Sequence, residues 1–289
     1  MKVALTLDDL PHWPEYPYPQ GHSARSVADA LIDGFGRHGL KGIYAFANSK
    51  PFVDDPTLTT IMDDWLAAGH YIGNHTHSHI ILHQTSADEY IADIDLADEL
   101  LAPWIDKAPS RFFRYTWNIR GETEEKRVAV KSHIEALNYQ AAECSSWFFE
   151  WDWDKAYVSC LERGDIEGIT FLRQSFLEFA LNQLAHDDAG MQQIFGRAVP
   201  HILLLHNLSF VEEIMDDFLT ALENSDLEFI SLEEAIADNA YAQAGVFPCG
   251  EFLVYWRKLL WRDGVDSLEV PPGQLGTYNR VLEMANTRL

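Results

Sequence analysis

The run "KVALTLDD" (residues 2–9) decides the fold, because a short apolar segment gives way at once to two acidic residues. A short apolar segment with polar or turn residues at its ends is typical of a buried strand, and Asp8 and Asp9 directly follow this one. Further segments share this character: "KGIYAFAN" (41–48), "HYIGN" (70–74), "RFFRY" (111–115), "HILLLH" (201–206) and "LEFISL" (227–232). We expect each of these segments to form a strand.

Segments with helical spacing separate the expected strands. In "SVADALIDGFGRHG" (26–39) apolar residues recur every fourth position and Gly39 suits the helix end. Similar patterns cover residues 87–105, 125–138 and 209–224. This alternation predicts parallel strands joined by crossover helices, and therefore an α/β sheet or barrel.

Reactive side chains stand at the ends of several expected strands, which is where a barrel gathers its active site. Asp8 and Asp9 follow the first strand, His75 follows 70–74, Arg114 lies near the end of 111–115, and His206 ends 201–206. We expect these side chains to converge at one mouth of the barrel.

The composition of the chain excludes several classes of protein. Of 289 residues, 47% are hydrophobic and 23% charged, the balance of a globular protein, and without a linker or repeat we expect one main domain. The 45 acidic residues against 21 basic ones give a net charge of −24, which repels phosphate backbones and anionic lipids. We therefore expect no nucleic-acid partner and no membrane-surface role.

Other sequence features argue against disulfides and membrane insertion. Cys144, Cys160 and Cys249 are widely spaced, which argues against a disulfide framework and against a cysteine-based zinc site. No apolar run is long enough to span a membrane, and the N-terminus lacks a signal-peptide pattern. Localisation stays open: cytoplasmic for the sequence as given, periplasmic or secreted if a leader was removed. The oligomeric state is not predicted.

Histidines are concentrated in "GNHTHSHIILH" (73–83), and two of them have the spacing of metal ligands. On a helical turn His75 and His79 would share one face, close enough to bind one ion. We interpret His77 and His83 as surface or supporting groups. A hydrolytic metal site needs three protein ligands and an open position for water, and Asp9 completes the three.

Plainer explanations exist for each of these groups. The histidines could form a polar surface cluster, and the paired acids could cap a helix. Arg114 could make a structural ion pair, and His206 could be a core histidine at a strand end. The placement of all of them at strand ends favours a catalytic site instead.

Four short motifs, in order, resemble those of the polysaccharide deacetylases (carbohydrate esterase family four). They are "TLDD" (6–9), "HTHSH" (75–79), "RYTW" (114–117) and "LLLH" (203–206). The family usually shows T-F-D-D, H-T-x-S-H, R-x-P-Y and L-x-L-H. The opening "LTLDDLPHW" (5–13) is closer to a bacterial branch that reads D-D-L-P. The resemblance covers roughly residues 1–240.

The resemblance implies a distorted (β/α) barrel over residues 1–240 that binds one divalent ion, zinc foremost, with cobalt or nickel as alternatives. Asp9, His75 and His79 would be its ligands. Asp8 would be the general base and His206 the general acid.

Four further roles also follow only from the resemblance. Arg114 would orient Asp8 and stabilise its charge. The backbone N–H of Trp117 would help to hold the oxyanion, and Tyr115 beside it is a candidate substrate contact. An acid in "FFEWDWD" would keep His206 protonated, either Glu150 or Asp152, with Glu150 slightly favoured by position.

This chain departs from the family pattern in two places. Thr116 and Trp117 replace the Pro and Tyr of R-x-P-Y, so the groove wall should differ. A loop with several prolines and aromatics, residues 12–22, either covers the site mouth or is fixed by packing. Of the tryptophans at 147, 151 and 153, we expect at most one or two to contact substrate.

Residues 241–289 lie beyond the resemblance, and we expect them to form a C-terminal extension of unknown role, packed on the barrel or mediating self-association. The function that the sequence favours is metal-dependent removal of an acetyl or similar acyl group from an N-acylated sugar or glycan. One alternative is hydrolysis of a cyclic amide or ureide. Another is an inactive carbohydrate-binding module, against which the presence of Asp8 argues.

Overall fold

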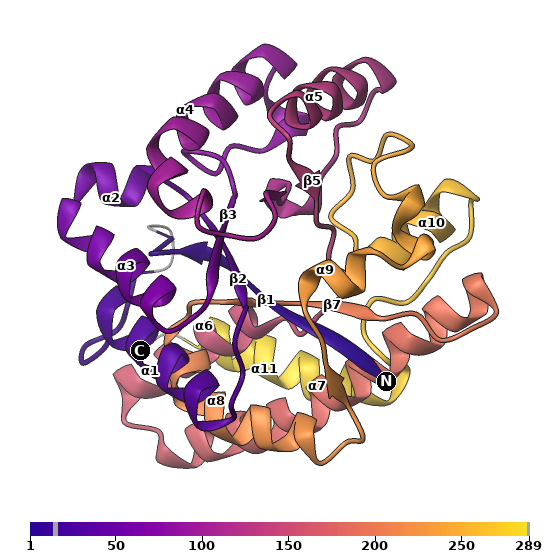
Figure 1. Cartoon of the computed structure of the whole chain (residues 1–289). Coiled ribbons are helices and arrows are strands. Elements are labelled where there is room, and N and C mark those ends of the chain that lie inside the picture. Colours follow the sequence, from indigo (N-terminus) through magenta and orange to yellow (C-terminus); the bar gives the residue numbers. More distant parts are fainter. Residues whose placement is uncertain (14–16, 288–289) are drawn as a thin grey trace.

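Strand β1 (Lys2–Leu10) lies in the middle of a parallel sheet, with Val3, Leu5 and Leu7 fully or almost fully buried (Figure 1). The computed structural model describes residues 1–13 and 17–287. The sheet order is β5-β4-β3-β2-β1-β7-β6, and β8 pairs with the N-terminal end of β1. The remaining strands are β2 (Tyr44–Ala47), β3 (Tyr71–Asn74), β4 (Phe112–Phe113), β5 (Gln140–Ala141), β6 (Ser146–Trp147), β7 (His201–His206) and β8 (Glu228–Phe229).

The sheet must curl, because β5 and β6 stand at opposite ends of the strand order but are joined by only residues 142–145. That connection spans at most about 18 Å. A flat sheet of this order would separate its ends by about 29 Å. The linker is fixed to both sides, since Ala142 N donates to Phe113 O (2.8 Å) and Ser145 N donates to Ile202 O (2.9 Å). The expected α/β barrel is confirmed as a distorted, incompletely closed one.

Helices cover the outside of the curved sheet, as the crossover rule requires (Figure 1). The α-helices of the described chain are α1 (Ala24–Arg37), α2 (Lys50–Asp54), α3 (Thr59–Ala67), α4 (Ala87–Ile105), α5 (Glu124–Ala136), α6 (Glu150–Arg163), α7 (Ile166–Phe195), α8 (Ser209–Glu223), α9 (Leu232–Ile236), α10 (Tyr255–Arg262) and α11 (Leu275–Asn286). Within the described residues, none of these helices is long and apolar enough to cross a bilayer.

The expected strands and helices are all present, and the structure contains further strands and helices that were not predicted. Strands β5 and β6 have two residues each, too few to show a period. Helices α6 and α7 follow each other without a strand between them, so the simple alternation breaks over residues 150–195.

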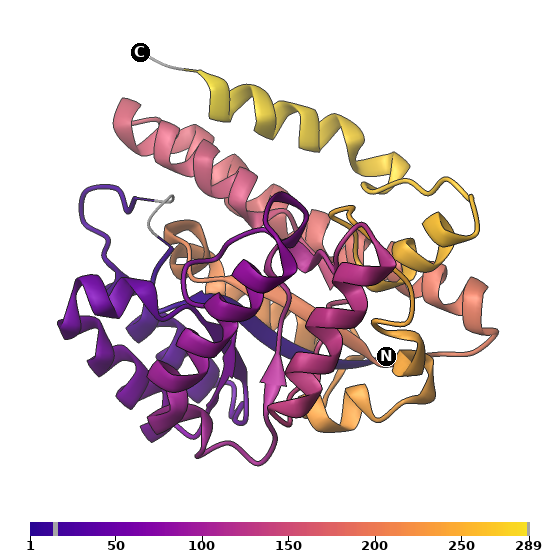
Figure 2. The same ribbon diagram turned by 90° about the horizontal axis from the view of Figure 1, so that it is seen from above.

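Residues 241–287 lie against the barrel. Tyr255 N donates to Cys144 O (2.9 Å), Gly121 and Cys249 form an isolated antiparallel bridge, and α11 packs along α6 (Figure 2). Trp256, Leu259 and Val281 belong to the same hydrophobic core as the sheet. The boundary at residue 240 between the barrel and its C-terminal extension stays a prediction.

Candidate active site

Asp8 and Asp9 lie near the end of β1 and line the same cavity. In an unbroken strand, neighbouring side chains point to opposite faces of the sheet. Here the register with β2 shifts between Asp8 and Leu10, and Asp9 has a φ of 66°. This bulge allows both carboxylates to face one cavity although they are adjacent in sequence.

The segment that carries His75 and His79 is a loop after β3, so the predicted helical turn is wrong. Thr76 and His79 both have positive φ, 70° and 56°. Asn74 Oδ1 accepts a hydrogen bond from Thr76 N (2.8 Å), and Thr76 Oγ1 accepts one from His79 N (3.1 Å). The two imidazoles still meet, with ring centroids 5.0 Å apart. Local hydrogen bonds, rather than helical periodicity, bring them together.

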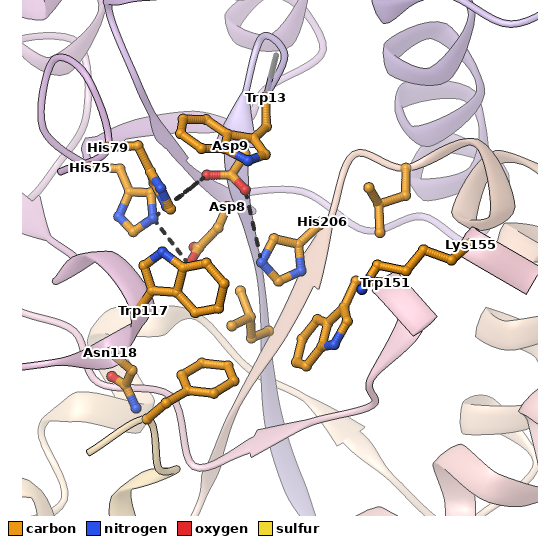
Figure 3. A pocket seen from close by; sticks show the side chains of 13 residues that line it. Asp8, Asp9, Trp13, His75, His79, Trp117, Asn118, Trp151, Lys155 and His206 are labelled. Atoms are coloured by element: carbon orange, nitrogen blue, oxygen red, sulfur yellow. Dashed lines mark ion pairs between the residues drawn. The ribbon is translucent and has the colours of Figure 1, made fainter. Parts of the chain in front are cut away.

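Asp9, His75 and His79 form the buried three-residue cluster that the sequence predicts (Figure 3). Asp9 Oδ1 lies 3.7 Å from His75 Nε2 and 3.4 Å from His79 Nε2. In a tetrahedral zinc site with bonds of about 2.1 Å, neighbouring ligand atoms are roughly 3.4 Å apart. The cluster is therefore close to the dimensions that one divalent ion requires.

The protonation states of the cluster also suit a cation. His75 Nδ1 lies 2.8 Å from Arg114 O, so this nitrogen donates to the carbonyl and leaves Nε2 without a proton. Burial lowers the pKa of His75 to about 3 and the pKa of His79 well below its ordinary value. Burial raises the pKa of Asp9 to about 7, and its Oδ1 has no hydrogen-bond partner in the described chain. Neutral imidazoles beside an unpartnered carboxylate oxygen fit one divalent ion.

Arg114 holds Asp8 from the floor of the site. Its Nη1 donates to Asp8 Oδ1 (3.2 Å), its Nη2 to Thr6 Oγ1 (3.0 Å) and its Nε to Ala142 O (2.7 Å). Burial raises the pKa of Asp8, and the positive charges of Arg114 and His206 oppose that rise. The Asp8 carboxylate is therefore held by a hydrogen bond, whereas Asp9 Oδ1 has none among the described residues. Thr6, which begins the first motif, was not predicted to support the site.

His206 is paired with Glu150, and this contact separates the two acids that the sequence left open. His206 Nδ1 lies 2.7 Å from Glu150 Oε1, with Glu150 fully buried. Asp152 instead accepts from Tyr278 (2.7 Å) and Lys155 (3.2 Å). Burial alone would lower the pKa of His206, but the hydrogen bond and charge of Glu150, together with the charges of Asp9 and Asp8, raise the pKa to about 9. Of the two acids, Glu150 is the one that favours a protonated imidazole.

Aromatic rings surround the mouth of the cavity, whose volume is about 160 Å³. Trp13 lies on the His79 ring at 4.2 Å between centroids, and Trp151 meets His206 edge-on at 5.5 Å. Trp117 and Phe252 complete the wall and contact each other edge-on at 5.3 Å. Phe252 comes from the segment beyond the resemblance, and no pattern in the sequence pointed to it.

Of the three tryptophans near residue 150, only Trp151 is among the residues that line the cavity. Trp147 and Trp153 are buried in the core. His77 lies outside the cluster, with its Nδ1 2.7 Å from Ser49 Oγ. His83 is half-buried and is not part of the cluster either.

The loop over residues 12–22 is described only in part. Trp13 lines the cavity, and Tyr18 Oη donates to Asn207 O (2.7 Å). Residues 14–16, which belong to the loop expected either to cover the site mouth or to be fixed by packing, lie outside the described residues.

The turn that carries Trp117 has an unusual backbone. Trp117 and Asn118 have φ values of 54° each, in the left-handed region that bulky residues avoid at a cost of about 1 to 3 kcal/mol per residue. The Trp117 side chain is 38% exposed and faces the cavity. The Tyr115 ring packs in the core against Phe113 and Tyr90. Tyr115 is not among the residues that line the cavity, so its side chain does not lie where the expected substrate contact would be.

Two sequence comparisons relate the chain to known proteins. Residues 1–132 match the family model described as polysaccharide deacetylase. A chitin deacetylase from Arthroderma benhamiae is 26% identical over 146 residues, which are 48% of this chain and 36% of that protein. The match therefore spans about a third of the length of this relative. Through this segment the chain is similar to the polysaccharide deacetylase family.

Solved structures of the deacetylase family share the fold. A CE4 family pseudoenzyme from Bacillus anthracis has a TM-score of 0.56 and 13% identity, over 82% of this chain and 66% of that chain. A family 4 carbohydrate esterase from Streptomyces lividans, in complex with acetate, has a TM-score of 0.50 and 15% identity. The match covers 81% of this chain and 95% of that chain. At such identities the likeness shows the fold alone. Membership in the D-D-L-P branch stays a prediction.

Proposed function

We propose that this chain is a metal-dependent hydrolase that removes an acetyl group from an N-acetylated sugar or glycan. The observation that carries the proposal is the Asp9–His75–His79 cluster with two differently tuned groups beside it. Asp8 is held by Arg114 on one side of the cluster, and His206 is held by Glu150 on the other. A pure binding module has no need of a fixed base and a fixed acid at one cation site.

The three ligands would be Asp9, His75 and His79, which leave the side facing the cavity open. A divalent ion bound there would lower the pKa of a water molecule and polarise the acyl carbonyl. We favour zinc, since two imidazoles and a carboxylate are ligands that zinc accepts, with cobalt and nickel as alternatives.

The remaining steps belong to the protein's own groups. The Asp8 carboxylate, oriented by Arg114, would accept a proton from the attacking water. The backbone N–H of Trp117 would donate to the carbonyl oxygen as negative charge develops on it. The His206 imidazolium, kept charged by Glu150, would deliver a proton to the departing nitrogen, because an amine leaves poorly unless it is protonated.

The cavity bears on the kind of substrate. Its volume of about 160 Å³ takes an acylamino group, while the rest of a sugar would lie against the indole rings at the mouth. The same compact shape keeps a second candidate open, a hydrolase of small cyclic amides or ureides. An inactive fold is a third, since the Bacillus anthracis protein is described as a pseudoenzyme.

Release of acetate from N-acetylated chitooligosaccharides, with and without a chelator, tests the proposal. We expect acetate release that the chelator abolishes and that zinc, cobalt or nickel restores. Ring opening of dihydrouracil or allantoin without acetate release would favour the second candidate. No turnover of either class by the fully metal-loaded protein would favour the third.

A further inference from the structure

Lys258 of α10 is buried beside the turn that carries Trp117, at 0% exposure. Its Nζ donates to the backbone carbonyl of Asn118 and to Glu143 Oε2 (2.9 Å). Glu143 also accepts from Arg120 Nη1 (2.8 Å) and Gly245 N (3.0 Å). Burying an ammonium is costly even when it is paired, so its contact with one particular carbonyl calls for a reason beyond packing.

The same stretch of chain holds the turn at other points. Asn118 Nδ2 donates to Leu253 O (2.6 Å), and Arg120 N donates to Cys249 O (3.1 Å). Phe252, between these contacts, packs against Trp117 in the cavity wall. Residues 249–258 therefore contact both the backbone and the side chain of the turn.

A turn of this kind needs outside support. Trp117 and Asn118 are successive left-handed residues other than glycine, a conformation that persists only when the surroundings enforce it. Within the turn itself, two backbone hydrogen bonds hold this conformation. Asn118 N donates to Tyr115 O (2.9 Å), and Ile119 N donates to Thr116 O (3.1 Å). Figure 3 shows Trp117 and Asn118 on one side of the cavity, across from Trp151 and Lys155.

We propose that Lys258 is a positioning residue for the active site: it holds the Trp117–Asn118 turn so that the Trp117 N–H points to the developing oxyanion. The inference rests on the proposed function for the purpose of this N–H, and on the contacts above for the support itself. Residues 249–258, which lie beyond the resemblance over residues 1–240, thus support the catalytic centre.

The test is the Lys258→Met variant, compared with wild type by amide hydrogen exchange and by steady-state kinetics. Removal of Lys258 leaves Arg120 and Glu143 as a neutral pair, so we expect the variant to fold. The amides of Asn118 and Ile119 should exchange about tenfold faster or more, with β1 unchanged. The value of kcat should fall about 10- to 100-fold, KM should change by less than about threefold, and metal content should stay the same.

Two further variants separate positioning from a general structural role. Arg257→Met is the matched control, because Arg257 is a partly buried cation of the same helix that contacts Ser267 and Glu269 instead of the turn. It should leave exchange at the turn and kcat as in wild type. Lys258→Arg keeps the charge and the hydrogen-bond donors. Compared with Lys258→Met, it should regain part of the exchange protection at the turn and part of kcat. If Met is not tolerated, Lys258→Gln keeps a donor without the charge and should give intermediate exchange.

The inference is overturned if a folded Lys258→Met protein matches Arg257→Met in both exchange and kcat, or if KM rises and kcat does not fall. A wild-type protein without deacetylase activity would instead refute the proposed function. In that case the exchange comparison alone would still show whether Lys258 supports the turn.

Discussion

Asp8 and Asp9 are adjacent in sequence but differ in their neighbours. Asp9 Oδ1 is near two imidazole nitrogens and lacks a hydrogen bond, whereas Asp8 Oδ1 accepts one from Arg114. We predict that Asp8→Asn lowers kcat at least about 100-fold and leaves about one ion per chain, because the ligand set is intact. Asp9→Asn should lose the ion. Kinetics and elemental analysis of both variants check this, and loss of metal from Asp8→Asn alone would mean that the two roles are reversed.

His206 gives a pH-dependent prediction. Its folded-state pKa of about 9 lies above the ordinary value of 6.5. The interactions of the charged ring with Glu150, Asp9 and Asp8 therefore stabilise the fold fully below about pH 6.5, and this stabilisation is lost as pH rises through about 9. NMR titration of the His206 ring in metal-free protein should show a midpoint near 9. Glu150→Gln should lower that midpoint by at least about one pH unit. An unchanged midpoint would show that Glu150 does not control the charge of His206.

Asp152→Asn is the matched control for the Glu150 experiment. Asp152 contacts Lys155 and Tyr278 and has no hydrogen bond to His206. Its substitution should leave the His206 midpoint within a few tenths of a pH unit.

At the scale of elements, the loop after β3 depends on a neighbouring strand end for its shape. Asn48, fully buried after β2, donates through Nδ2 to the carbonyls of His75 and Thr76. We predict that Asn48→Ala weakens zinc affinity about 10-fold, because supporting hydrogen bonds orient the ligands. Ser49→Ala should change the affinity by less than about twofold, since Ser49 contacts His77, which is outside the cluster. Competition titration with a chromogenic chelator measures both, and equal affinities in the two variants would contradict the argument.

The elements also show how far sequence reasoning reaches. Strand ends were predictable, because apolar runs followed by acids or histidines are a local signal, and β1 and β7 place Asp8 and His206 directly opposite each other. The conformation of residues 75–79 was not predictable, because a spacing of four also fits a loop with left-handed residues. Glu150 and Asp152 could be separated only by three-dimensional contacts.

At the scale of the whole molecule, the site is assembled from both ends of the chain. Phe252 and Lys258 act on a cavity whose other residues lie between positions 8 and 208. Neither residue carries a motif, and their role depends on how residues 249–258 lie against the barrel. No local pattern could have revealed this contribution.

Metal binding should stabilise the whole fold. A ligand that binds only the folded state adds about 2.7 kcal/mol to the free energy of unfolding at 100 times its Kd. We predict this gain for zinc in chemical denaturation of the chelator-treated protein. His79→Ala should show little gain, whereas His83→Ala should behave as wild type because His83 lies outside the cluster. The same gain in all three proteins would place the ion elsewhere.

The central claim is that Asp9, His75 and His79 together hold one ion. Elemental analysis of purified wild-type and His79→Ala protein, after dialysis against zinc and then metal-free buffer, tests it most directly. The account predicts about one divalent ion per wild-type chain and close to none in the variant. Equal metal content in the two proteins, or none in a folded wild type, would contradict it.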